Sequence, residues 1–184
     1  MKTLLLLFSL LSTGCSNAAE LQQMVAGKSQ IAFTSTQMGV PVKGGFSKFA
    51  SQVSFDPANA AAAKIRVDVD LASIDAGSSD ANAEVKGKVW LDIAAFPKAS
   101  FVSNSVKSLG GARYEARGPL TIKGISQVIA VPFSVRVDAA GTWLEGGFAL
   151  PRLQFNIGAG DWSDTSVVAN EVQVKFTLLL TNKK

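Results

Sequence analysis

The sequence predicts an all-β fold in which about eight antiparallel strands form an up-and-down barrel or a sandwich, together with one short helix. Apolar residues alternate with polar ones along most of the chain, and Gly, Asn, Asp and Pro separate the alternating segments. The apolar fraction is 47% and the charged fraction only 17%, a balance that favours a large apolar interior.

The clearest strand pattern lies at residues 65–71, where Ile65, Val67 and Val69 alternate with charged residues. An earlier alternating segment over residues 31–33 is followed by another over 40–55, which ends at the turn signal Asp56-Pro57. Further strands are predicted over residues 100–109, 112–123, 126–137, 142–155 and 171–181. Glycine pairs between or within these segments indicate turns, bulges or close backbone approach: Gly44-Gly45, Gly110-Gly111 and Gly146-Gly147.

One segment lacks the alternation. Residues 78–88 are rich in helix-forming residues, Ser79-Asp80 suits a helix N-cap, and Glu84 follows soon after. We expect one short helix there, continuing irregularly through residues 90–93 to Phe96-Pro97.

The first residues resemble a secretory signal peptide. Lys2 precedes an apolar run over residues 4–11, and small residues follow up to Ala19. The run is shorter than the ~20 residues of a membrane-spanning helix. We expect cleavage after Ala18, with residues 1–18 as the signal and 19–184 as one exported domain. Alternatively, residues 11–15 resemble a lipoprotein box, which would anchor the protein through a lipidated Cys15.

Composition excludes several kinds of chemistry. The sequence has no histidine, and its one cysteine is Cys15, so Ser-His and Cys-His nucleophiles are excluded. We expect no metal site, no cofactor and no catalysis, and the scattered basic residues indicate no nucleic-acid surface. Asp161 and Asp164 form a candidate carboxylate pair for a hydrolase; the alternative interpretation is a polar loop that caps one end of a barrel.

Several short motifs together resemble the YceI-like family of periplasmic, polyisoprenoid-binding proteins. The resemblance covers nearly the whole chain after the signal segment. Its motifs are residues 29–33, 37–40, 45–49, 55–57, 90–92, 96–97, 118–124 and 152–158, in the order of the family.

The resemblance implies an extended, antiparallel, eight-stranded lipocalin-like β-barrel in the periplasm. Gln37-Met38-Gly39 resembles the subgroup of domains associated with cytochrome b561, which implies a quinone or another membrane isoprenoid as ligand. Family members often carry a histidine near Gln37, so a histidine-dependent headgroup contact is not implied for this chain.

A barrel of about eight strands either fills with side chains or holds one slender ligand. We predict a tunnel lined by alternating apolar residues; the alternative is that these residues pack the core. The predicted lining residues are Phe33, Phe46, Phe49, Phe55, Val69, Phe101, Leu120, Phe133, Phe148 and Phe176.

Arg152 completes the predicted ligand-binding set. On a predicted strand, it could donate to a phosphate or quinone oxygen at the tunnel mouth. It could instead pair with Asp161 or Asp164 and brace a loop. Trp90 and Trp162 are expected to shape the mouth or to plug the barrel end.

The function expected from these features is a periplasmic binding protein for a polyprenyl phosphate or a ubiquinone-like lipid, acting as carrier, store or sensor. An alternative is an interaction module that serves a membrane redox partner such as a b-type cytochrome. Neither interpretation involves a nucleic acid or a membrane-spanning segment after the signal.

Overall fold

The computed structural model describes residues 21–182, and the predicted signal at residues 1–18, with Cys15, lies outside them. The described residues contain twelve strands, one α-helix and five 3₁₀ helices. The strands are β1 (Leu21–Met24), β2 (Gln30–Gln37), β3 (Val40–Phe46), β4 (Phe49–Ser54), β5 (Lys64–Asp70), β6 (Ile74–Asp75), β7 (Lys98–Val102), β8 (Ser105–Gly110), β9 (Arg113–Ile122), β10 (Ile125–Asp138), β11 (Gly141–Pro151) and β12 (Glu171–Asn182). The helices are α1 (Ser79–Lys86), η1 (Ala26–Lys28), η2 (Pro57–Ala62), η3 (Leu71–Ser73), η4 (Arg152–Phe155) and η5 (Gly160–Trp162).

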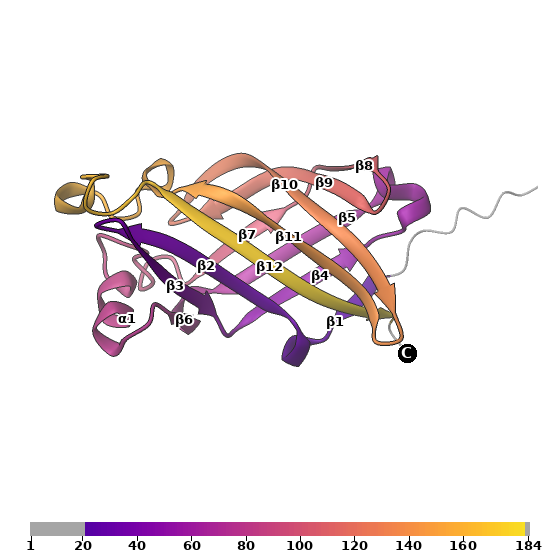
Figure 1. Cartoon of the computed structure of the whole chain (residues 1–184), viewed down its shortest axis with the longest axis horizontal. Helices are drawn as coiled ribbons and strands as arrows, with labels where there is room; N and C mark the ends of the chain where they lie inside the picture. The colour runs from indigo at the N-terminus through magenta and orange to yellow at the C-terminus, as the bar shows by residue number, and fades with distance from the viewer. Residues whose placement is uncertain (1–20, 183–184) are drawn as a thin grey trace, which may run out of the picture.

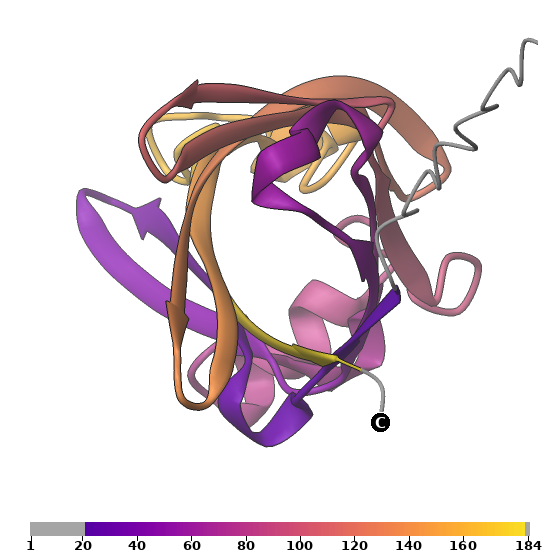
Figure 2. The same cartoon turned by 90° about the vertical axis from the view of Figure 1, so that its right-hand side faces the viewer.

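Eight of the strands form a closed antiparallel ring. Each strand pairs with the next in the order β1, β4, β5, β7, β9, β10, β11 and β12, and β12 pairs again with β1 to close the barrel. The ring is seen end-on in Figure 2. The predicted all-β, eight-stranded lipocalin-like barrel is therefore confirmed. Strands β2, β3 and β6 extend the sheet beyond β12, and β8 pairs with β9.

The barrel has two different ends, which we name by their elements. The α1 end holds α1, β6, η4, η5 and the turn between β2 and β3, and the β8 end holds β8, η2 and the turn between β10 and β11 (Figure 1). Two clusters of buried apolar residues follow this division. One contains Phe55, Tyr114 and Phe133, and the other contains Leu71, Leu91 and Phe155.

The single strand predicted over residues 100–109 is two strands. β7 and β8 lie along the same edge of β9, and the chain bends between them at Ser103, whose hydroxyl accepts a hydrogen bond from the Ile65 amide at 2.9 Å. A Cβ on Gly118 would lie 1.9 Å from the Val102 carbonyl oxygen. Glycine is therefore required for the close approach at this bend, and alternation alone does not reveal the break.

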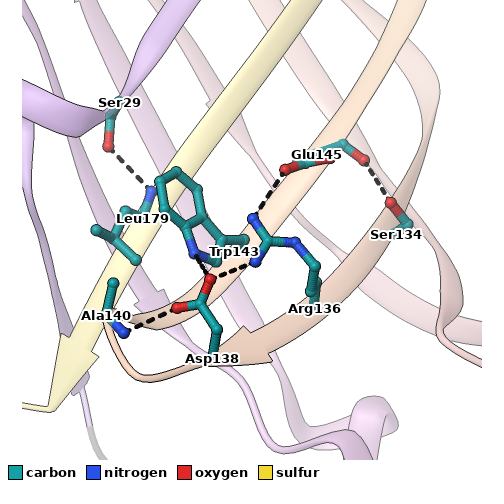
Figure 3. Close-up of polar contacts among 8 residues, drawn as sticks. All are labelled: Ser29, Ser134, Arg136, Asp138, Ala140, Trp143, Glu145 and Leu179. Atoms are coloured by element: carbon teal, nitrogen blue, oxygen red, sulfur yellow. Dashed lines mark hydrogen bonds and ion pairs between the residues drawn. The ribbon is translucent and has the colours of Figure 1, made fainter.

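A second strand break lies on one edge of β12. β1 and β2 both pair with this edge, and η1 separates β1 from β2 along the chain. The Leu179 amide, which faces the interruption, donates to the Ser29 hydroxyl at 3.0 Å (Figure 3). The Val25 amide donates to the Leu179 carbonyl at 2.8 Å. These two bonds satisfy the backbone groups that the strand break leaves without ladder partners.

The predicted short helix is present as α1, but its cap lies at Ser78, whose side chain accepts from the Ala81 amide, rather than at Ser79-Asp80. The strand predicted over residues 142–155 ends at Pro151 and continues as η4. The short strands β1 and β6 were not predicted. None of the helices in residues 21–182 is long and apolar enough to cross a membrane.

Candidate ligand-binding cavity

The barrel contains a cavity of about 400 Å³ between its strands. This volume falls within the ~300–1,000 Å³ range of small-molecule sites. Apolar side chains from six of the eight barrel strands line it, including Val69 on β5, Leu120 on β9, Phe148 on β11 and Val174 on β12, whereas β1 and β4 contribute none. The cavity can therefore hold a slender apolar molecule.

Nine of the eleven predicted ligand-binding residues line the cavity. They are Phe33, Phe46, Val69, Phe101, Leu120, Phe133, Phe148, Arg152 and Phe176. Two do not. Phe55 is 4% exposed and packs against Tyr114 and Phe133, and Phe49 packs against the same buried cluster. For these two residues, the alternative interpretation of core packing is the correct one.

Two glycines in the wall make room for phenylalanine rings. Gly44 pairs with Phe33 across β3 and β2, and Gly146 pairs with Phe176 across β11 and β12. A Cβ would lie 2.2 Å from the Phe33 ring at Gly44, and 2.8 Å from the Phe176 ring at Gly146. Both rings therefore lie against glycine backbone. A bulkier residue at either position would push the ring out of its place in the wall.

Most polar lining groups lie towards the α1 end, and Ser100 lies on β7. Ser35 and Gln37 from β2, Glu84 from α1, and Trp90 and Trp162 line the cavity at the α1 end. The two indole rings are 5.4 Å apart, and the Trp90 Nε1–H donates to Glu84 at 3.1 Å. Glu84 is exposed and also lines the cavity, so the cavity reaches solvent at this end.

Exposed apolar side chains lie beside this opening. Met38 and Val40, at the turn between β2 and β3, are 72% and 62% exposed. The Met38 amide donates to the carbonyl of the exposed Val167 at 2.8 Å. Gln37, the polar lining residue next to this turn, forms an isolated antiparallel β-bridge with the lining residue Val168.

Arg152 is the most deeply buried charged residue described, at 1% exposure. All its hydrogen bonds go to backbone carbonyl oxygens: Nε donates to Ala169, Nη1 to Ile157 and Gly158, and Nη2 to Trp162 and Val168, at 2.6–3.1 Å. A guanidinium group has five N–H donors, so each is used. Its carbon also lies 5.7 Å from the centre of the Trp90 ring, and burial lowers the pKa of the group.

Two expectations about Arg152 were wrong. The residue opens η4 rather than lying within a strand. Among residues 21–182 it forms no ion pair with Asp161, Asp164 or another acid. It does brace a loop, but through the carbonyl groups of residues 157–169. Because its donors are occupied, Arg152 lines the cavity without a free N–H for a ligand headgroup.

Asp161 lies in η5 and Asp164 in the loop that follows it, and both are exposed. The hydroxyl and the amide of Ser166, followed by the Val167 amide, hold the pKa of Asp164 below its usual range. A carboxylate with a lowered pKa is a poor proton donor near neutral pH. In the part of the chain described, no three acidic, histidine or cysteine side chains gather as a metal-binding group.

Part of the cavity lining was not predicted, because it comes from a helix and from loops rather than from strands. Ala81 and Val85 face the cavity from α1, and Leu91, Ile157 and Val168 from loops. No period-two pattern marks these residues. Only the helix prediction pointed to the α1 segment, and it did not indicate which face of the helix would lie against the barrel.

A closed antiparallel barrel with an apolar internal cavity defines the lipocalin-like class of binding proteins. Residues 23–180 match the YceI-like domain family model, and the chain belongs to that family.

Relatives and solved structures agree with this assignment. A UPF0312 protein of Pseudomonas syringae pv. syringae is 31% identical over 115 residues, which are 62% of this chain and 57% of that protein. The chain thus spans about half the length of the curated relatives it matches. The crystal structure of Burkholderia cenocepacia BcnA is 42% identical, with a TM-score of 0.84 over 86% of this chain and 99% of BcnA. A polyisoprenoid binding domain from Saccharophagus degradans shares the fold at 16% identity and a TM-score of 0.70, over 88% of this chain and 98% of that domain.

Proposed function

We propose that the protein binds a long apolar isoprenoid, with the tail inside the barrel and the headgroup at the α1 end. The observation that carries this proposal is the cavity of about 400 Å³, which apolar side chains line over most of its length and polar groups line at one end. Binding of a flexible apolar tail is favoured by ~25 cal/mol for each Å² of apolar surface that the cavity removes from water. The polyisoprenoid binding domain from Saccharophagus degradans shares the fold, which supports the same choice of ligand.

The charged groups that line the cavity favour an uncharged headgroup, such as that of a ubiquinone, over a polyprenyl phosphate. Arg152 has no free donor, because five carbonyl groups occupy it. Within the described residues, no lysine lines the cavity, and Glu84 would repel a phosphate. Gln37 and Ser35 supply neutral donors and acceptors that suit a quinone carbonyl.

We further propose that the protein acts in the periplasm as a carrier, store or sensor of this lipid, rather than as an enzyme. This location depends on the predicted signal at residues 1–18, or on the alternative lipid anchor at Cys15. Fractionation of cells that produce the full chain, with a Cys15→Ser variant as control, distinguishes the two. Release of the variant, but not of the wild type, into the soluble envelope fraction would identify an anchor.

The test of binding is organic extraction and mass spectrometry of the full-length protein purified from its native envelope. We expect an isoprenoid with an uncharged headgroup at a substantial molar ratio. A purified protein that carries no lipid and binds neither ubiquinone nor polyprenyl phosphate in solution would contradict the proposal. The alternative of an interaction module for a membrane cytochrome would then be preferred.

A further inference from the structure

The barrel interior changes from hollow to filled partway along its length. Ile65, Ala116, Leu144 and Leu178 line the deepest part of the cavity, and each is at most 8% exposed. Beyond them, towards the β8 end, the interior residues are as deeply buried and do not line the cavity. These residues are Val53, Phe55, Val106, Tyr114 and Leu180, at 0–5% exposure.

Three aromatic rings form the wall at this boundary. Phe133 lies 5.6 Å from Tyr114 and 5.9 Å from Phe55, and Phe55 lies 5.0 Å from Tyr114, measured between ring centres. Phe133 also lines the cavity, whereas the other two rings lie behind it. The three come from β10, β9 and the segment after β4, so the wall joins separate parts of the barrel.

The aromatic side chains nearer the α1 end are arranged differently. Phe33, Phe46 and Phe148 line the cavity and remain partly accessible, and the ring of Phe33 lies against glycine backbone. They border the space without crossing it. The first well-packed obstacle for a tail that enters from the α1 end is therefore Phe133, supported by Tyr114 and Phe55.

The length of the hollow part is limited by this wall. On β12 the lining residues run from Val172 to Leu178, which is roughly 20 Å of strand at ~3.4 Å per residue. A tail that exceeds this space must fold back or leave its surplus at the α1 end. There it exposes apolar surface to water, and the surplus adds no affinity.

We propose that Phe133, supported by Tyr114 and Phe55, determines the longest isoprenoid tail that the protein binds in full. This inference rests on the proposed function and adds a specificity determinant to it. The cavity selects for length at the β8 end and for headgroup at the α1 end.

The experiment measures the affinities of a series of ubiquinones with increasing tail length, for purified wild type and variants. For the wild type, affinity rises with each added isoprene unit and then levels off. Phe133→Ala removes the ring at the wall, so the plateau moves to longer tails. For a ubiquinone whose tail is about one isoprene unit longer than the wild-type plateau, we expect the variant to bind about tenfold more tightly than the wild type, or more. Ala116→Leu fills the deepest part of the cavity and moves the plateau to shorter tails.

A pair of identical substitutions provides the control. Phe133→Leu and Phe148→Leu each shorten one cavity-lining phenylalanine, one at the wall and one nearer the α1 end. We expect Phe133→Leu to move the plateau, and Phe148→Leu to change the affinity of all tails by a similar factor. If Phe133→Ala does not fold, Phe133→Leu and Ala116→Leu decide the question.

The outcomes separate this inference from the function on which it rests. Folded Phe133→Leu and Ala116→Leu proteins that level off at the wild-type tail length overturn the length determinant, while wild-type binding leaves the proposed function intact. A wild-type protein that binds no member of the series overturns both.

Discussion

Inward-facing phenylalanines have different roles at the two ends of the barrel. At the β8 end, Phe55, Phe133 and Tyr114 pack together, and each is at most 5% exposed. Towards the α1 end, Phe46 and Phe148 face the same interior but border a cavity. Both ends are built from strands with the same alternation of apolar and polar residues. The two ends differ in how far side chains fill the barrel interior. At the β8 end, η2 and β8 contribute Ala60 and Val106 to the buried cluster.

Two arginines, one at each end of the barrel, also differ in burial and in hydrogen-bond partners. Arg152 at the α1 end and Arg136 at the β8 end each lie over a tryptophan ring, at 5.7 Å and 5.0 Å from its centre. Arg152 is buried and bonded to five carbonyl groups. Arg136 is exposed and pairs with Asp138 and Glu145, and Asp138 also accepts from Trp143 (Figure 3). The hollow end is therefore held by a buried network, and the filled end carries its charges on the surface.

The largest effect is expected from Arg152→Leu. The substitution leaves five carbonyl groups around residues 157–169 without their donors. Buried carbonyl groups that lose charged donors destabilise a fold, here by about 3–5 kcal/mol. We expect the melting temperature of the ligand-free protein to fall by about 10 °C, as measured by differential scanning calorimetry.

Arg136→Leu is the matched control, because it removes the same side chain from a tryptophan ring at the surface. Exposed ion pairs contribute ~0–1 kcal/mol, so its melting temperature should stay within a few degrees of wild type. Equal losses in the two variants would contradict the difference between the ends. Unchanged stability of Arg152→Leu with lost ligand binding would instead assign Arg152 to the headgroup site.

The second prediction compares two phenylalanines. Phe55→Ala creates a cavity in a packed cluster and should cost about 3–5 kcal/mol, whereas Phe46→Ala enlarges an existing space and should cost less than ~2 kcal/mol. Urea unfolding of both ligand-free variants measures the difference. Similar costs would mean that the α1 end is packed in solution as tightly as the β8 end.

Much of this architecture can be predicted from the sequence, because it depends on local pattern. Alternation locates most strands, and the composition of residues 78–88 locates α1. The break between β7 and β8 escaped prediction, since it depends on the contact between Gly118 and Val102 from different strands. For the site, alternation identified inward-facing residues but not their level along the barrel, so Phe55 was assigned to the lining. The partners of Arg152 could not be predicted, because any residue can supply a carbonyl group.

The third prediction concerns the hollow part directly. Phe148→Trp and Phe46→Trp each place a larger ring on the cavity wall, so they should reduce the lipid retained after purification by about tenfold, without loss of stability. Phe49→Trp is the control, since Phe49 is absent from the lining. Lipid content by mass spectrometry and melting temperature are measured together. Full lipid content in both cavity variants would place the ligand elsewhere.

The smallest expected effect is the response of the two ends to acid. Asp138 at the β8 end has a pKa held below its usual range, first by the Ala140 amide and then by Arg136 and Trp143, and the pKa of Asp164 at the α1 end is held low by Ser166. A carboxylate whose pKa is lower in the folded than in the unfolded state stabilises the fold above its unfolded pKa of ~3.9. That contribution is lost as the pH falls through the folded pKa.

We therefore expect the melting temperature to be flat between about pH 6 and 8, since the sequence has no histidine, and to fall below about pH 4. Asp138→Asn and Asp164→Asn should each lower it slightly at pH 7 and reduce the fall between pH 7 and pH 3. Affinity for a neutral ubiquinone should also be flat between pH 6 and 8. A step in affinity in that range, with no step in melting temperature, would indicate a cavity carboxylate with a raised pKa. Glu84, which is the carboxylate lining the α1 end, would be tested first with Glu84→Gln. Loss of the step in this variant would assign the step to the headgroup site at the α1 end.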